Sequence, residues 1–197
     1  MDILSAISER RSIRKFTSAE ISREVIEKII DSGIKAPSSK NSQPWRFYVI
    51  EGDTKAELMI ILKRRYEVLQ KTTFLFKPIG QWTKSVKKTL DIMDQAPVSI
   101  FVFEHREKRS FFIRLSSFWK RSTYLSIGAA IENMILAAVS FGLGSLWICD
   151  IMFFEKTLRK YFKTNDDIMS ALSLGVPAEN PKPRPRQSIQ ETVKYWT

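Results

Sequence analysis

The chain is 197 residues long, 44% hydrophobic and 12% aromatic, with no low-complexity linker, so we expect one domain spanning residues 1–197 around one sizeable core. Its single cysteine, Cys149, excludes an intramolecular disulfide framework, and the N-terminus has no basic and apolar leader, so we expect a cytoplasmic protein. The net charge of +11 would suit a polyanion-binding protein. However, the sequence shows no zinc-ligand spacing, RNA-recognition aromatic motif or helix-turn-helix. Attraction of small phosphorylated molecules is therefore the simpler explanation of the positive charge.

The first expected element is a short helix that Asp2 caps, followed by a strongly basic segment. In extended chain, alternate side chains share a face, so Arg10, Ser12 and Arg14 would point together. Two guanidinium groups flanking a hydroxyl suit a phosphate, because arginine offers a planar fork of charged donors. The alternative is a solvated basic surface, which a run of arginines more often forms.

A second helix, which Ser22 caps and Gly33 ends, leads to a polar loop at residues 36–45. This loop carries hydroxyl, carboxamide and lysine side chains between Pro37 and Pro44. Prolines restrict the backbone and remove donors, so the loop could form a rigid shelf that holds a flat ligand with polar edges. An ordinary helix-to-strand connection has a similar composition and remains the alternative.

The middle of the chain is predicted to alternate strands and helices. A strand at 46–50 precedes an amphipathic helix that Asp53 caps, and an aromatic stretch at 71–82 leads into a weaker helix. The apolar run 97–103 reads as a buried central strand. His105, the only histidine, lies in a charged turn and is predicted to be exposed, which leaves little support for a histidine metal site or a Ser-His-Asp triad.

The last third of the chain begins with the longest expected helix, residues 123–141, whose small residues are one glycine and four alanines. Small residues allow close helix packing, either within the core or against a second copy of the chain. The remaining elements are a buried strand at 145–149, a short amphipathic helix at 153–162, a further strand at 168–174 and a proline-rich arm at 178–186. Alternating prolines would hold this arm extended, as a loose tail or as a clamp that brings its basic residues onto an anion.

Four motifs in this order resemble those of the nitroreductase family of FMN-dependent oxidoreductases, over nearly the whole chain. They are Arg-Arg-Ser-x-Arg near the start, Ala-Pro-Ser-Ser-x-Asn-x-Gln-Pro-Trp after the second helix, Gly-Leu-Gly-Ser-Leu-Trp-Ile after the small-residue helix, and Leu-Gly-x-Pro followed by Lys-Pro-Arg. The resemblance implies an α+β fold, a three-layer α-β-α sandwich with a mainly antiparallel central sheet, in a homodimer with FMN at the subunit interface.

The resemblance also implies a set of FMN-binding residues and no catalytic acid, base or metal ligand. Residues of the first and last motifs would hold the FMN phosphate and ribityl chain, a further basic residue would lie near the pyrimidine edge of the ring, and loop residues from the other subunit would pack on the flavin. The phosphate and ribityl residues are Arg10, Ser12, Lys182 and Arg184. The residue near the pyrimidine edge is Arg14, and Arg11 belongs to the same motif. The loop residues from the other subunit are Pro37, Ser38, Ser39, Asn41 and Gln43.

The implied reaction takes hydride from NADH or NADPH and passes electrons to a nitroaromatic, quinone or similar acceptor. A protein of the same fold with another reductive role, dehalogenation or flavin handling, is the second hypothesis, and a cofactor-free polyanion-binding module is the third. The chain departs from the family where Cys149-Asp150 replaces a common Glu-Gly pair, and residues 66–88 contain no clear counterpart of the side chains that contact the flavin carbonyls.

Overall fold

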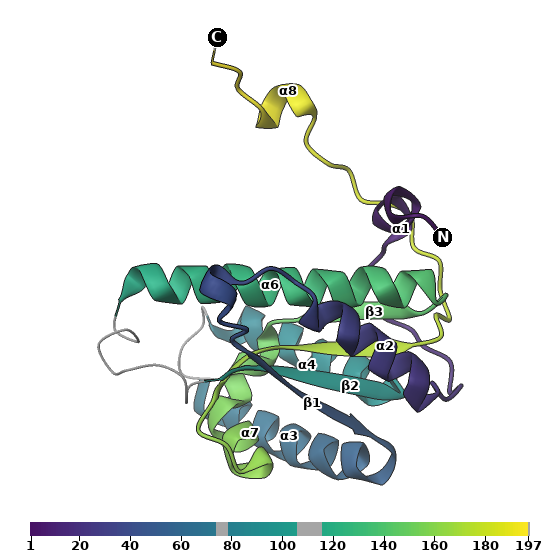
Figure 1. The fold of residues 1–197 in the computed structure, drawn as a ribbon. Coiled ribbons are helices and arrows are strands. Elements are labelled where there is room, and N and C mark those ends of the chain that lie inside the picture. The colour runs from purple at the N-terminus through teal and green to yellow at the C-terminus, as the bar shows by residue number, and fades with distance from the viewer. Residues whose placement is uncertain (74–78, 106–115, 197) are drawn as a thin grey trace.

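The protein is an α+β structure in which helices cover both faces of one antiparallel sheet (Figure 1). The computed structural model describes residues 1–73, 79–105 and 116–196. The strands, which lie in the order β1-β2-β4-β3, are β1 (Trp45–Glu51), β2 (Val98–Glu104), β3 (Gly144–Ile148) and β4 (Asp167–Gly175). The longer helices are α2 (Arg23–Ile34), α3 (Gly52–Thr73), α4 (Ile79–Gln95), α6 (Ser117–Ser140) and α7 (Glu155–Phe162).

Shorter elements complete the described chain. They are α1 (Ile3–Glu9), η1 (Ser39–Asn41), η2 (Asp150–Phe154) and α8 (Ile189–Thr192). Asp2 and Ser22 cap α1 and α2 as the sequence predicts, because their side-chain oxygens accept backbone N–H groups of the first turn. Asp53 is not a cap: α3 begins at Gly52, so this carboxylate lies in the first turn. Of the aromatic stretch expected at 71–82, residues 74–78 lie outside the described residues.

The central strand β2 is buried on both faces, as its continuous apolar run predicts. Phe101 and Phe103 face the core under α3, α4 and α7, whereas Ile100 and Val102 face the core under α2 and α6. Figure 1 shows the resulting layers, with α2 and α6 on one side of the sheet and α3, α4 and α7 on the other. The three-layer α-β-α sandwich expected from the sequence is therefore confirmed.

Helix α6 is the main helix of one layer, and two of its small residues pack within the chain. Ala130 and Ala138 are fully buried, and α6 approaches α2 so closely that a Cβ on Gly33 would lie 2.7 Å from Cγ of Met134. By length and composition alone α6 is apolar enough to cross a membrane, a test that core helices also pass. Part of its surface stays open, however, because Leu125 is 76% exposed and Tyr124 is 49% exposed.

Candidate functional site

The basic segment after α1 runs along the edge of the sheet. Ile13 donates its N–H to the carbonyl of Ser145 in β3 (2.9 Å), and Thr17 donates to Val176 just after β4 (2.9 Å). The buried side chain of Ile13 packs on Gly144, where an added Cβ would lie 2.7 Å from its Cγ1. The second glycine of the Gly-Leu-Gly motif therefore has a steric reason, since a larger residue would push this segment away from the sheet.

The proline-rich arm after β4 returns to the same segment. Ala178 donates its N–H to the carbonyl of Lys15 (2.9 Å), and the Glu179 carboxylate accepts the N–H groups of Arg14 (2.5 Å) and Lys15 (3.2 Å). Two basic stretches about 170 residues apart in sequence thus lie side by side. Beyond this contact the arm passes α1 and leaves the body of the protein (Figure 1).

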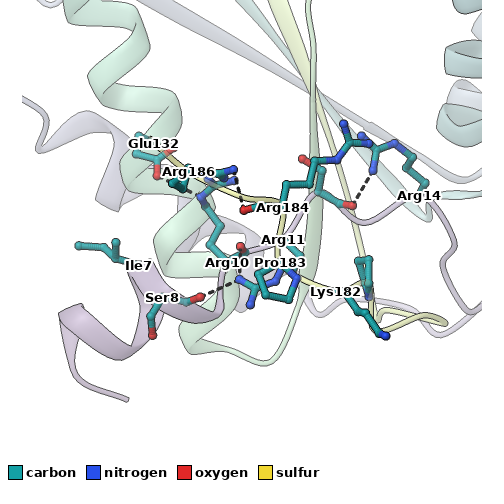
Figure 2. Close-up of a pocket in the computed structure, with 12 residues that line it drawn as sticks. Ile7, Ser8, Arg10, Arg11, Arg14, Glu132, Lys182, Pro183, Arg184 and Arg186 are labelled. Carbon is teal, nitrogen blue, oxygen red and sulfur yellow. Dashed lines mark hydrogen bonds and ion pairs between the residues drawn. The ribbon is translucent and has the colours of Figure 1, made fainter. Parts of the chain in front are cut away.

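A cavity of about 370 Å³ lies where the two basic stretches meet, close to α1 and α6. Six cationic side chains line it, and Figure 2 shows Arg14 and Arg184 directed toward the same region. The one acidic residue in its wall, Glu132 of α6, pairs with Arg10 at 3.4 Å. The full lining is Ile7, Ser8, Arg10, Arg11, Ser12, Arg14, Glu132, Pro181, Lys182, Pro183, Arg184 and Arg186.

Backbone carbonyls hold three of these guanidinium groups. Arg11 donates to the carbonyls of Ser8 (2.6 Å) and Arg10 (2.9 Å), Arg14 donates to Ser12 (3.0 Å), and Arg186 donates to Arg184 (3.3 Å), as Figure 2 shows. An arginine has five N–H donors, so each retains donors for an anion after these contacts. The arrangement suits a phosphate, which needs several charged donors from different directions.

A second cavity of about 340 Å³ shares Arg14 and Arg184 with the first. It extends along the end of β3 to Cys149 and Asp150, and α4 contributes Ser85, Lys88 and Thr89 to its wall. Sequence reasoning missed these α4 residues. Their i, i+3, i+4 spacing, which places them on one helix face, is the signal that could have found them.

Around this second cavity, Cys149 and Asp150 have different surroundings. The Asp150 carboxylate turns toward α4, where it accepts hydroxyl groups from Ser85 (3.0 Å) and Thr89 (3.2 Å). Cys149 reaches solvent, yet partial burial and, to a smaller extent, the Asp150 charge raise the pKa of its thiol. Cys149 is therefore a protonated thiol at neutral pH, which makes it a poor nucleophile.

The polar loop between α2 and β1 contacts α6 and does not line either cavity. Ser39 donates its N–H to Ser126 of α6 (3.3 Å), and the Lys40 ammonium sits 4.9 Å from the centre of the Trp119 ring. Lys40, Asn41 and Gln43 all have positive φ values, of 52°, 52° and 42°, which non-glycine residues rarely adopt. Such a shape is kept only where surrounding contacts fix it, and functional sites are where it is most often found.

The structure therefore brings together six of the eleven residues expected at the site. Arg10, Arg11, Ser12, Arg14, Lys182 and Arg184 line the basic cavity. Pro37, Ser38, Ser39, Asn41 and Gln43 do not line it within one chain. Their loop contacts α6 at Ser126, about 9 Å along the helix from Glu132 at ~1.5 Å per residue.

The sequence predicts an exposed His105, but in the structure this side chain is largely buried. Only 12% of its side chain is accessible, because the ends of three strands surround it. Its Nε2 lies 3.0 Å from a guanidinium nitrogen of Arg46, and its Nδ1 lies 3.5 Å from a carboxylate oxygen of Asp166, whose side chain is 4% exposed. His105 therefore belongs to a polar cluster with Arg46 and Asp166 and lines neither of the two cavities.

Replacing His105 with alanine is expected to lower the free energy of unfolding by about 1–3 kcal/mol, because the buried Asp166 carboxylate loses a polar neighbour. Chemical denaturation followed by fluorescence measures this change. In an Asp166→Asn background, His105→Ala should lower the free energy of unfolding by less, because the charged group that His105 faces has already been removed. Equal costs in both backgrounds would show that the two side chains do not interact.

Comparison with known proteins decides the family. The model of the nitroreductase family matches residues 7–176, which include the first three motifs and the start of the fourth. The chain belongs to the nitroreductase family. Among curated nitroreductase relatives, a Methanothermobacter thermautotrophicus protein with the provisional name NADH dehydrogenase/NAD(P)H nitroreductase is 31% identical, over 93% of this chain and 82% of its own.

Other nitroreductase relatives differ in what their names say. The 4-nitrobenzoate reductase of Pseudomonas putida is 27% identical, over 91% of this chain and 87% of its own. A crystal structure of a BluB-like flavoprotein from Clostridium difficile superimposes with a TM-score of 0.83 at 25% identity, covering 100% of both chains. A provisionally assigned nitroreductase from Desulfovibrio desulfuricans, solved in complex with FMN, gives 0.71 at 29% identity, covering 100% of this chain and 98% of that one.

Proposed function

We propose that the protein is an FMN-dependent NAD(P)H oxidoreductase that passes electrons to nitroaromatic, quinone or similar acceptors. The observation that carries this proposal is the convergence of Arg10, Ser12 and Arg14 with Lys182 and Arg184 on one cavity. FMN brings a phosphate dianion and a planar ring with polar edges. The basic cavity fits the phosphate, and the adjoining cavity at the end of β3 has space for part of the ring.

We assign roles within the basic cavity from charge and position. Arg10, Ser12, Lys182 and Arg184 hold the phosphate and ribityl chain, and Arg11 adds positive charge from the same wall. Arg14 lines both cavities, as Arg184 does, and the family resemblance assigns Arg14 to the pyrimidine edge of the ring. A cation at that edge stabilises negative charge on the reduced ring and raises its reduction potential.

The chemistry requires no acid or base from this chain. FMN, when bound, would supply hydride acceptance at N5 and onward transfer to the acceptor. Cys149 has a protonated thiol, and His105 lies in the polar cluster with Asp166. We therefore expect His105→Ala to leave flavin reduction nearly unchanged, and Cys149→Ser to change at most the reduction potential.

We further propose a homodimer in which the loop residues Pro37, Ser38, Ser39, Asn41 and Gln43 complete the cofactor site of the partner. Two features of the single chain support it. The loop keeps an unusual backbone shape, and its residues line neither of the two cavities described above. In addition, apolar side chains of α1 and α6 are exposed, among them Leu4 and Leu125. Dimer formation through these helices would bury them.

A second candidate role has support from specific relatives. The BluB-like flavoprotein shares the fold closely, and rat iodotyrosine deiodinase is 30% identical over half of this chain and 35% of its own. Dehalogenation or flavin handling on the same scaffold is therefore the alternative. In either case we propose that residues 1–197 form one domain and that the protein is cytoplasmic.

The first experiment asks whether the purified protein carries flavin. A yellow protein that releases FMN on denaturation would exclude the cofactor-free polyanion-binding module. Oxidation of NADH and NADPH is then measured with 4-nitrobenzoate, nitrobenzene, a quinone and a halogenated tyrosine as acceptors. Turnover of nitro compounds or the quinone supports the oxidoreductase, whereas reduction of the halogenated tyrosine alone would favour the alternative.

Steady-state kinetics are expected to give parallel double-reciprocal plots for NAD(P)H and a quinone. Donor and acceptor would have to stack on the same face of one flavin ring, so the oxidised donor must leave before the acceptor binds. Initial rates at varied concentrations of both substrates test this expectation. Intersecting lines would mean that donor and acceptor bind at the same time, which would contradict their binding in turn at one position on the flavin.

A further inference from the structure

Glu179 occupies an unexpected position for an acidic residue, at the junction of two basic segments. Its Oε1 atom accepts the backbone N–H groups of both Arg14 and Lys15, at 2.5 and 3.2 Å. Both hydrogen bonds have a charged acceptor, so they are among the stronger ones in proteins. Glu179 is separated from Lys182, the first cation of the arm, by Asn180 and Pro181 alone.

Among the described residues, Glu179 is also the last side chain that anchors the arm to the body. Before it, Val176 and Ala178 form backbone hydrogen bonds with the first basic segment. After it, the hydrogen bonds of the described arm join arm residues to each other, as between Arg186 and Arg184 or between Ser188 and Glu191. The direction in which the arm leaves the body is therefore set at Glu179.

The sequence after this anchor transmits its direction to the cations. Prolines at 181, 183 and 185 fix φ at alternate positions and disfavour helical turns, so the chain between them is stiff. A change of backbone direction at residue 179 would therefore move Lys182 and Arg184 together. Both are exposed, and no acidic partner of either is seen in the described structure.

Repulsion between the positive charges of the cavity acts against this anchoring of the arm. The six cations of the cavity repel one another, and this repulsion favours an arm that swings away from Arg10 and Arg14. The hydrogen bonds of Glu179 oppose that movement. Its negative charge, however, lies close to Arg14 and weakens the attraction of the cavity for an anion.

We propose that Glu179 is the positioning residue of the phosphate site: it holds the arm so that Lys182 and Arg184 face Arg10 and Arg14 across the cavity. It acts as a hydrogen-bond acceptor for two backbone N–H groups and touches no part of the cofactor itself. The inference rests on the proposed function in that the anion is taken to be the phosphate of FMN.

The test compares Glu179→Ala with Glu179→Gln, and Glu191→Ala serves as the control. Glu191 is an acidic residue of the same arm that caps α8, so its loss removes the same charge without touching the anchor. FMN affinity is measured by quenching of flavin fluorescence on the flavin-free protein. Amide hydrogen exchange of residues 10–17 reports directly on the N–H groups of Arg14 and Lys15.

Glu179→Ala is expected to bind FMN about tenfold to a hundredfold more weakly, the scale of a charged hydrogen bond, with faster exchange of the two amides. Glu179→Gln keeps an acceptor oxygen and removes the opposing charge, so it should bind at least as tightly as the wild type, with slow exchange. Glu191→Ala should match the wild type in both measurements.

Failure of this inference can be told apart from failure of the proposed function. If the wild type binds no FMN, the proposed function is wrong, and hydrogen exchange with thermal shifts in inorganic phosphate still tests the anchor. If Glu179→Ala binds FMN like the wild type, or if Glu179→Gln is as weak as the alanine variant, the positioning role is wrong. Should the alanine variant not fold, the glutamine variant and the exchange rates decide.

Discussion

Arg184→Ala is expected to weaken FMN binding by about 1.5–3 kcal/mol, the scale of a hydrogen bond to a charged group. Arg10→Ala should cost at least as much, because it also leaves the Glu132 carboxylate, now 3.4 Å from Arg10, unpaired beside the phosphate. Arg10→Ala/Glu132→Gln should therefore recover part of the loss. Flavin fluorescence titration measures all three variants.

The control for these variants is Arg23→Ala, since Arg23 forms an exposed pair with Glu27 on α2, away from the cavity. It should bind FMN like the wild type. If Arg10→Ala and Arg184→Ala both keep wild-type affinity, the basic cavity is not the phosphate site. Affinity should also fall as salt concentration rises, because several charges contribute.

Leu125→Glu is expected to split the proposed homodimer and to release FMN at the same time. The side chain is 76% exposed in the single chain, so a charge there should not disturb the monomer fold. In the dimer it would be buried without a partner, which costs several kcal/mol. Sedimentation with simultaneous detection of protein and flavin absorbance follows both events.

The matched control is Ile60→Glu, which places the same charge on an exposed apolar residue of α3 (52% accessible), on the other side of the sheet. It should remain dimeric and yellow. A Leu125→Glu monomer that retains tightly bound FMN would show that the polar loop acts within its own chain. An unchanged dimer would show that this part of α6 lies outside the interface.

Local patterns predicted the sheet and its helices well. The run 97–103 has apolar side chains at both odd and even positions, and β2 is accordingly covered on both faces of the sheet. Ser22 and Asp2 cap helices because capping depends on neighbours within three residues. Helix boundaries were less certain: α3 starts one residue before Asp53, since a flanking glycine at φ 55° already turns the chain.

Contacts between distant segments could not be read from spacing. Nothing local says that Arg10 and Arg184 share a cavity, and only the family resemblance placed them together. The error at His105 has the same cause, because its sequence neighbours are charged while β1 and the start of β4 bring Arg46 and Asp166 against it. Lys88 was missed because its helical spacing with Ser85 and Thr89 shows only that they share a helix face, not that this face lines a cavity.

The contact between Ile13 and Gly144 joins the basic segment after α1 to the edge of the sheet. With so little space between them, the two positions cannot change independently. Across relatives, a side chain at position 144 should occur together with a smaller residue at position 13. Any redesign of the flavin site that enlarges residue 13 would first have to widen the edge of β3.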